Sequence, residues 1–306
     1  MSNRWLILIL PIVCGLTAAN MYYIQPLIPE AAHVTGAGYS LIAMIYSVAL
    51  VGDAIAITFI TPMGDFLNRK KIISILYVML FLTMLLFYMA SNVYLLISLS
   101  FFIGIGASVI PIILAYVGTN KTSGLASIGK IMAGVLFGIL LSRFVSSFFA
   151  ALWGWKSIYL FGAGCMLISL FLINYFLPPD GSRKKENIAY FKMALSSFSL
   201  LKSNASVRLY SASGFFIMAI FAAFWNNISI YLTHQFNFDQ FSIGLFSLAG
   251  VLGALVAMFS NKILKAFNAN NTLLFLLLFF IFLLMVFYSS YLAILVLLTL
   301  ALDSLI

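Results

Sequence analysis

The chain has 306 residues, of which 64% are apolar and 8% charged, whereas soluble domains carry roughly 25% charged residues. This composition excludes a soluble globule and leaves no polar domain for separate catalysis or nucleic-acid binding. The net charge of +9 comes from basic residues between apolar runs, where they indicate membrane topology. Cys14 and Cys165 lie within apolar runs, so we expect no disulfide framework, metal site or cofactor.

Apolar windows that are long enough to cross a bilayer, about 20 residues each, recur along the chain. They cover 5–28, 39–64, 71–90, 92–117, 125–150, 156–177, 207–233, 240–261 and 272–290, and a tenth begins at Tyr291. The residues from Tyr291 onward reach roughly 24 Å at about 1.5 Å per residue, less than the roughly 30 Å hydrocarbon core. We therefore expect the chain to end inside or barely across the bilayer. The fold class predicted is an all-α, polytopic membrane protein.

Basic residues fall in alternate loops, and Lys and Arg are retained on the cytoplasmic side of a membrane. These loops hold Arg4, Arg69, Lys70, Lys71, Lys121, Arg183, Lys184, Lys185, Lys192, Lys202, Arg208, Lys262 and Lys265. The intervening loops hold Lys156 and otherwise Glu30, His33, His234 and Asp239. The pattern predicts a multi-pass protein of the plasma (inner) membrane with a cytoplasmic N-terminus.

One long polar stretch divides the chain. We expect a six-span bundle at 1–177, a cytoplasmic linker at 178–206, and a shorter group of about four spans at 207–306. Within the linker, Ile188, Phe191, Leu195 and Phe198 recur at helical spacing, which is typical of an amphipathic helix at the membrane surface. A solvated linker between two bundles explains the stretch equally well.

Two charged residues lie inside predicted spans, where ionisable groups are functional candidates by default. Asp53 is near the middle of 39–64, and Arg143 is in the outer part of 125–150. One hypothesis is a buried pair that rearranges when Asp53 takes up a proton. The alternative is an arginine that extends outward to the interface and a neutral, capped aspartic acid.

Polar and aromatic side chains within spans are candidates for a solute cavity, because hydrogen-bonding groups are costly in hydrocarbon unless they face water or a partner. They are Asn20, Tyr22, Tyr23, Gln25, Tyr116, Trp225, Asn226 and Asn227. Tyr22, Tyr23 and Trp225 are equally explained as interfacial aromatic residues. No cluster of charges accompanies them, which favours neutral or amphipathic solutes over strongly ionic ones.

Small residues at regular spacing predict close helix packing. Gly134 and Gly138 form such a face in 125–150, and Gly250 and Gly253 form a comparable notch in 240–261. Ordinary packing within one bundle explains both pairs without any hinge.

Several segments resemble the major facilitator superfamily. Residues 61–71 (TPMGDFLNRKK) are similar to its loop motif, and residues 20–27 (NMYYIQPL), 154–159 (GWKSIY), Phe224-Trp225 and 243–246 (IGLF) are similar to an efflux-type bacterial branch. The resemblance runs from about residue 5 to the end. It would cover about ten of the twelve spans of such transporters, and it implies a six-helix bundle plus an incomplete second bundle.

For the loop, the resemblance implies that Gly64, Asp65, Arg69 and Lys70 form a latch that holds the inward side closed. Without the resemblance, a plain positive turn explains the same residues. Thr61 and Asn68 stand where the family usually has glycine. The resemblance also implies that the spans 125–150 and 240–261 meet between the two bundles.

Many proton-coupled members carry an arginine in the fourth span, where this chain has Ser100, so Asp53 and Arg143 would have to provide the coupling. The resemblance implies a monomeric secondary transporter that moves a small organic solute by alternating access, with proton-coupled efflux as the expected mode. The alternatives are a uniporter and a truncated remnant that needs its missing spans.

Other functional classes have little support. An intramembrane enzyme would need paired carboxylates, an HExxH helix, or Ser and His at helix depth, and His33 and His234 fall in outer loops. A channel would show a re-entrant filter or rings of like charge. We therefore expect a small-molecule solute, a proton and the lipid bilayer as partners, with neither nucleic acid nor enzymatic activity.

Overall fold

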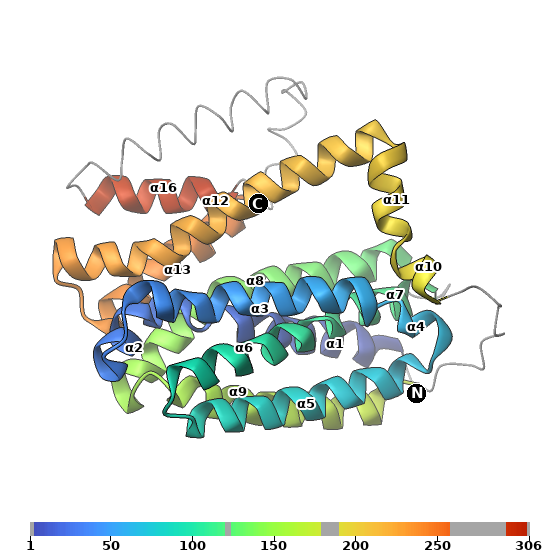
Figure 1. Cartoon of the computed structure of the whole chain (residues 1–306), viewed down its shortest axis with the longest axis horizontal. Coiled ribbons are helices and arrows are strands. Elements are labelled where there is room, and N and C mark those ends of the chain that lie inside the picture. Colours follow the sequence, from blue (N-terminus) through green and yellow to red (C-terminus); the bar gives the residue numbers. More distant parts are fainter. Residues whose placement is uncertain (1–2, 120–123, 179–189, 258–291, 305–306) are drawn as a thin grey trace.

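The computed structural model describes residues 3–119, 124–178, 190–257 and 292–304, and its secondary structure in these ranges is entirely helical (Figure 1). The N-terminal elements are α1 (Asn3–Tyr22), the 3-10 helix η1 (Gln25–Leu27), α2 (Ile28–Thr35), α3 (Tyr39–Phe59), α4 (Met63–Phe66), α5 (Arg69–Met89), α6 (Val93–Ala107), α7 (Val109–Thr119), α8 (Gly124–Trp153) and α9 (Ser157–Phe176). They are followed by α10 (Tyr190–Ala194), α11 (Ser196–Ser203), α12 (Ala205–Phe236), α13 (Gln240–Ala257) and α16 (Leu292–Ser304). The predicted all-α class is confirmed.

Seven helical segments are long and apolar enough to cross a membrane, namely Leu8–Thr35, Tyr39–Phe66, Arg69–Met89, Val93–Gly118, Ser127–Trp153, Ser157–Phe176 and Ala205–Phe236. They correspond to the first seven predicted spans. The eighth prediction corresponds to α13, α16 covers part of the tenth, and the predicted span 272–290 lies outside the described residues. The protein is therefore a multi-pass membrane protein.

The first membrane segment extends beyond the predicted end at residue 28. Pro26 and Pro29 lie in the first positions of η1 and α2, where proline is tolerated because the first helical N–H groups have no intrahelical acceptor. The chain thus continues as short helical pieces until Gly36, whose φ of 70° ends α2 in the left-handed region. Apolar periodicity alone did not predict this broken end.

We call α1 to α9 the N-terminal half and α12, α13 and α16 the C-terminal half. Helices in the N-terminal half are packed in pairs, with α1 along α8, α3 along α6 and α5 along α9. A Cβ atom on Gly104 of α6 would lie 1.8 Å from the carbonyl oxygen of Ala49 in α3. Cβ atoms on Gly134 and Gly138 of α8 would lie 2.4 and 2.2 Å from the carbonyl oxygens of Pro11 and Gly15 in α1. These helices therefore touch backbone to backbone, the mode of packing that small residues permit in membranes.

The C-terminal half has its own cluster of buried apolar side chains, contributed by α12, α13 and α16. Helix α13 packs against both α8 and α16, so the spans 125–150 and 240–261 do meet. Their contact uses Gly244, where an added Cβ would lie 2.8 Å from Cβ of Ser147, whereas Gly134 and Gly138 face α1. Gly250 faces α16 and Trp225, and the structure describes the backbone of Gly253 but not its surroundings.

The region between the halves contains the short helices α10 and α11. Phe191, Leu195 and Phe198 are exposed, and Ile188 lies outside the described residues. The Tyr190 hydroxyl donates to the carbonyl of Phe59 at the end of α3. An interfacial helix and a solvated linker both remain predictions for this segment.

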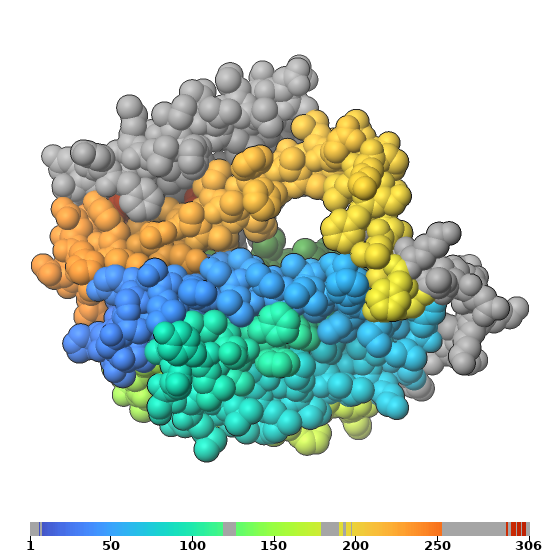
Figure 2. All heavy atoms as spheres, viewed as in Figure 1, coloured from blue at the N-terminus to red at the C-terminus, as the bar shows by residue number. Residues whose placement is uncertain are grey.

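The two halves are close at one end of the molecule and apart at the other (Figure 1). Helix α12 contacts η1 and α2, and we call this the η1 end. Toward α11 the same helix diverges from α3, at what we call the α4 end. Figure 2 shows an open hollow between the blue atoms of α3 and the orange and yellow atoms of α12 and α11, with green atoms behind it. We call this opening the central hollow.

Candidate functional site

The contacts at the η1 end interlock the two halves. The hydroxyl of Ser229 on α12 donates to the carbonyl of Gln25 at 2.9 Å. The amide of Gln240 at the start of α13 donates to the carbonyl of Pro26 at 3.0 Å and to Oγ of Ser147 at 3.1 Å. The irregular backbone around η1 supplies these acceptors, because its two prolines leave carbonyl groups outside the regular helical ladder.

A second contact closes the same end nearer its surface. The ring of His234 on α12 lies edge-on to Tyr39 of α3, and a ring nitrogen is 3.0 Å from the tyrosine hydroxyl. The following turn holds Asn237 at a φ of 52°, and Asp239 accepts from the backbone N–H of Ser242 at the start of α13. Hydrogen bonds from the side chain and backbone of Ser242 lower the pKa of Asp239. The α12–α13 turn is thus fixed in position.

Beneath these contacts lies Arg143, which is 0% exposed. Its Nε donates to Oε1 of Gln25 at 2.9 Å. Its Cζ atom lies 3.9 Å from the ring centroid of Trp225, 5.0 Å from Phe221 and 5.5 Å from Tyr22. Nη1 and Nη2 have no hydrogen-bond partner. The predicted cavity residues Tyr22, Gln25 and Trp225 are therefore brought together, around a guanidinium group.

Asp303 on α16 belongs to the same cluster, and sequence reasoning missed it. The indole Nε1 of Trp225 donates to its Oδ1 at 3.3 Å, and its Oδ2 has no partner. A Cβ on Gly250 would lie 2.2 Å from Oδ2, so that glycine makes room for the carboxyl group. A single acidic residue in the apolar run 292–304 was the available signal, by the reasoning applied to Asp53.

Asp53 and Arg143 are not brought together as an ion pair. Asp53 is half-buried on α3, and within the described part of the chain the ion pair found is that of Asp65 with Arg69. Arg143 extends toward η1 and α12 instead, where it contacts Gln25 and the rings of Phe221 and Trp225. A role for either residue in coupling remains a prediction.

Two of the other cavity candidates are part of the N-terminal core. Asn20 is buried, and its Nδ2 donates to Sδ of Met166 at 3.2 Å, while its Oδ1 has no partner. The ring of Tyr23 is buried edge-on against Tyr159. These contacts link α1, and the residue that follows it, to α9.

The remaining candidates lie on α7 and α12. The Tyr116 hydroxyl donates to the carbonyl of Pro178 at 3.2 Å, at the α4 end. Asn227 is exposed and donates to the Ala223 carbonyl of its own helix. Asn226 is half-buried, with Oδ1 unpartnered.

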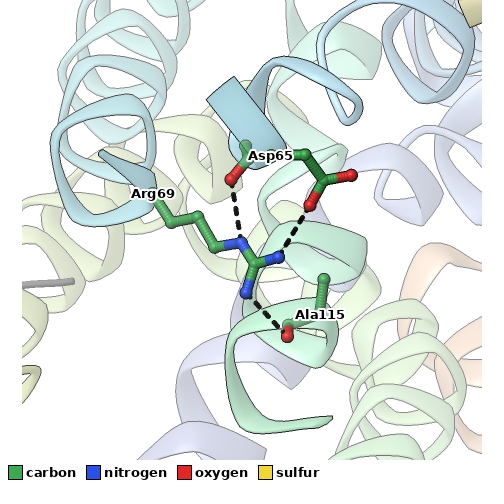
Figure 3. Close-up of polar contacts among 4 residues, drawn as sticks. Asp65, Arg69 and Ala115 are labelled. Atoms are coloured by element: carbon green, nitrogen blue, oxygen red, sulfur yellow. Dashed lines mark hydrogen bonds and ion pairs between the residues drawn. The ribbon is translucent and has the colours of Figure 1, made fainter. Parts of the chain in front are cut away.

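The loop residues predicted as a latch form a dense polar cluster (Figure 3). Arg69 is 2% exposed. Its Nη2 pairs with Oδ1 of Asp65 at 2.8 Å, its Nε donates to the Gly64 carbonyl at 3.0 Å, and its Nη1 donates to the Ala115 carbonyl at 2.8 Å. These bonds join α4 and α5 to α7.

The adjacent residues extend this anchor. Lys70 donates to the carbonyls of Asn174 and Leu177 at 2.8 and 2.7 Å, which ties α5 to the end of α9. Asn68, at a family glycine position, caps α5 by accepting from the N–H of Lys71. These contacts hold the α4 end of the N-terminal half together. Latching against the C-terminal half remains a prediction.

Lys156, the single basic residue predicted on the outer side, also has a local role. Its ammonium group donates to the carbonyl of Ala90, which follows α5, and it lies 5.4 Å from the ring centroid of Trp155. Partial burial lowers the pKa of Lys156. This cation therefore caps a helix C-terminus, which accounts for its presence among outer loops.

A sequence model of the Major Facilitator Superfamily matches residues 11–305. The chain belongs to the Major Facilitator Superfamily. Among curated relatives, it is 27% identical over 243 residues to the uncharacterized transporter YgaY of Escherichia coli O157:H7, covering 78% of this chain and 61% of that protein. The chain spans about 60% of the length of the curated relatives that it matches.

Solved structures with the same fold include the nucleoside transporter NupG in its D323A form, with a TM-score of 0.75 and 16% identity over 98% of this chain and 78% of that one. A bacterial homologue of the human lysosomal transporter Spinster, in an inward-facing and unoccupied conformation, matches with a TM-score of 0.72 and 14% identity. That match covers all of this chain and 73% of the other.

Proposed function

We propose that this chain forms the translocation pathway of a secondary transporter, not an enzyme, which moves a small organic solute by alternating access. The observation that carries the proposal is the asymmetry of the interface between the halves. They interlock through Gln25, Ser229 and Gln240 at the η1 end, and the central hollow separates them toward the α4 end (Figure 2). Rocking one half against the other around a fixed site would open each end in turn.

The orientation follows from loop charge. The basic residues Arg69, Lys70 and Lys71 lie at the α4 end, and the N-terminus is at that end as well (Figure 1). We place the α4 end in the cytoplasm and the protein in the plasma (inner) membrane. The central hollow then lies on the cytoplasmic side of the interlocked η1 end, and the Spinster homologue was solved in an inward-facing conformation.

The finer proposal is proton-coupled efflux by a monomer, with Asp53 as the proton acceptor. Asp53 lies half-buried on α3, which borders the central hollow. Uniport is the second candidate. It is favoured by Ser100, which stands where many proton-coupled relatives have an arginine and whose hydroxyl donates to the Ile97 carbonyl of its own helix.

Side-specific labelling of a thiol between the halves tests alternating access. The reporter is Asn226→Cys with Cys165→Ala, and Cys14 is retained because it is fully buried. A membrane-impermeant maleimide is added to inside-out and to right-side-out vesicles. We expect labelling from both sides. Labelling from one side alone would contradict the proposal.

A lock at the η1 end provides the matched control. Tyr39→Cys and His234→Cys, whose native rings touch, are joined by a short bis-maleimide before the reporter is probed. We expect the lock to abolish labelling from the outer side and to preserve labelling from the cytoplasmic side. Outer labelling that survives the lock would show that the reporter is reached by another route and would overturn the proposed gate.

A further inference from the structure

The guanidinium of Arg143 makes no direct ion pair in the described part of the chain. It is fully buried, its Nη1 and Nη2 have no acceptor, and no carboxylate lies within 4 Å of it in the described part of the chain. A buried charge without a partner is strongly unfavourable, and in membrane spans such charges are paired or face a polar pathway. Nη1 and Nη2 therefore lack an acceptor in this arrangement, and either a bound anion or the carboxylate of Asp303 could supply one.

The neighbouring amide presents a further donor. Because Nε of Arg143 is itself a donor, the amide atom facing it at 2.9 Å is Oε1 of Gln25. Nε2 of the same amide carries two N–H groups and is buried without a partner. Two hydrogen-bonded side chains thus carry three nitrogen atoms with free N–H groups, a donor set that suits an anion.

The aromatic rings restrict where the anion can bind. Trp225 covers one flat face of the guanidinium at 3.9 Å, so the edge that carries Nη1 and Nη2 remains for hydrogen bonding. That edge matches the two oxygens of a carboxylate. Tyr22 and Phe221 lie 5.5 and 5.0 Å from the same Cζ atom by their ring centroids, and Tyr22 is half-buried.

We propose that Arg143 and Gln25 bind the carboxylate of an organic anion, whose apolar body packs against Tyr22, Phe221 and Trp225. This inference rests on the proposed function and deepens it, because the bound anion is then the transported solute. Asp303 is the alternative occupant, since its unpartnered Oδ2 lies on α16 next to the same indole. If Asp303 pairs with Arg143 in the working protein, no external anion is required.

Equilibrium binding to the full chain in detergent at pH 7.5 tests the proposal. The probes are benzoate, phenylacetate and 3-phenylpropionate, each compared with its neutral amide, and the readout is tryptophan fluorescence. We expect saturable binding of at least one carboxylate and a signal that disappears in Trp225→Phe. We expect its amide to bind about tenfold to a hundredfold more weakly. No binding of any carboxylate, or equal binding of acid and amide, would overturn the proposal.

Three variants separate loss of the site from loss of folding. Arg143→Gln is expected to weaken carboxylate binding by about tenfold to a hundredfold, whereas Arg208→Gln, the same change at an exposed arginine, should leave binding unchanged. Gln25→Glu gives Arg143 a built-in carboxylate. It should therefore fold at least as stably and yet lose phenylacetate binding, and retained binding in this variant would contradict the site.

The outcome for Asp303 distinguishes the two occupants. Asp303→Asn removes a competing negative charge, so we expect carboxylate binding to be kept or tightened. Loss of binding in this variant would overturn the assignment of the anion to Arg143. If the protein binds carboxylates but is labelled from one side only, the proposed function is contradicted and the carboxylate site is not. Two-sided labelling without carboxylate selectivity would contradict this inference alone.

Discussion

Arg143 on α8 stacks against Trp225 on α12, with Cζ 3.9 Å from the ring centroid, so a cation–π contact joins the two halves of the molecule. The same indole donates to Asp303 on α16. One aromatic side chain therefore connects a buried cation with a buried carboxyl group. The contact lies below the interlocked η1 end, where a rocking motion would have to preserve or break it.

Graded replacement of Trp225 tests how this contact contributes to stability. Trp225→Phe keeps an aromatic face for Arg143 and loses the hydrogen bond to Asp303, which should cost about 1 to 3 kcal/mol. Trp225→Ala loses both and leaves a cavity, which should cost about 3 to 5 kcal/mol. Unfolding of the purified protein in detergent measures both. Equal costs would mean that the stacking contributes nothing.

The contact between α3 and α6 at Gly104 can be tested by comparing an alanine substitution there with one at an open glycine position. In Gly104→Ala the new Cβ would lie 1.8 Å from the Ala49 carbonyl oxygen, so α3 and α6 must separate at a cost of about 1 to 3 kcal/mol or more. At Gly164 of α9 nothing lies within 4 Å, so Gly164→Ala should be neutral or stabilising by up to about 1 kcal/mol. Thermal unfolding of the two variants should differ in sign, and similar losses would contradict the packing described.

The polar anchor at the α4 end depends on Arg69. Arg69→Gln removes the hydrogen bonds to the Gly64 and Ala115 carbonyls and the ion pair with the exposed Asp65, and we expect a loss of about 1 to 3 kcal/mol. Lys71→Gln, which alters an exposed neighbour, should change stability by less than about 0.5 kcal/mol. Denaturation in a mild detergent, followed by size-exclusion chromatography, compares the pair. Unchanged stability of the Arg69→Gln protein would mean that these basic residues act only as a signal for membrane topology.

Asp53 carries the proposed coupling to protons. In Asp53→Asn, pH-gradient-driven flux of labelled phenylacetate into proteoliposomes should disappear, while exchange of labelled for unlabelled phenylacetate continues, because exchange needs no net proton movement. The conservative variant Asp53→Glu, which keeps a carboxyl group on α3, should retain driven flux. An unchanged pH dependence in Asp53→Asn would exclude Asp53 as the coupling residue and would favour uniport.

The fold was predictable where its cause is local. Apolar windows located seven membrane segments, and the loop cluster was visible because Asp65 and Arg69 are only four residues apart in the sequence. The partners of Arg143 were not predictable in this way. Gln25 is 118 residues away, and Asp303 is 78 residues from the indole to which it bonds. Such contacts depend on how helices pack, which a single sequence does not specify.

The packing glycines illustrate the same limit. Their spacing predicted close approach, and Gly134 and Gly138 do lie against another backbone. Which helix they approach depends on tertiary structure, and it is α1. The contact of α8 with α13 uses Gly244 instead, which no spacing pattern distinguished.

The most direct test of alternating access is a pair of distance distributions measured by double electron–electron resonance in lipid nanodiscs. One spin-label pair replaces Tyr39 and His234 at the η1 end, and the other replaces Lys71 and Ser203 at the α4 end. We predict two populations in each pair, with the short η1-end distance accompanying the long α4-end distance, and a shift between them when phenylacetate is added. A single short η1-end distance that neither phenylacetate nor pH alters would contradict the account.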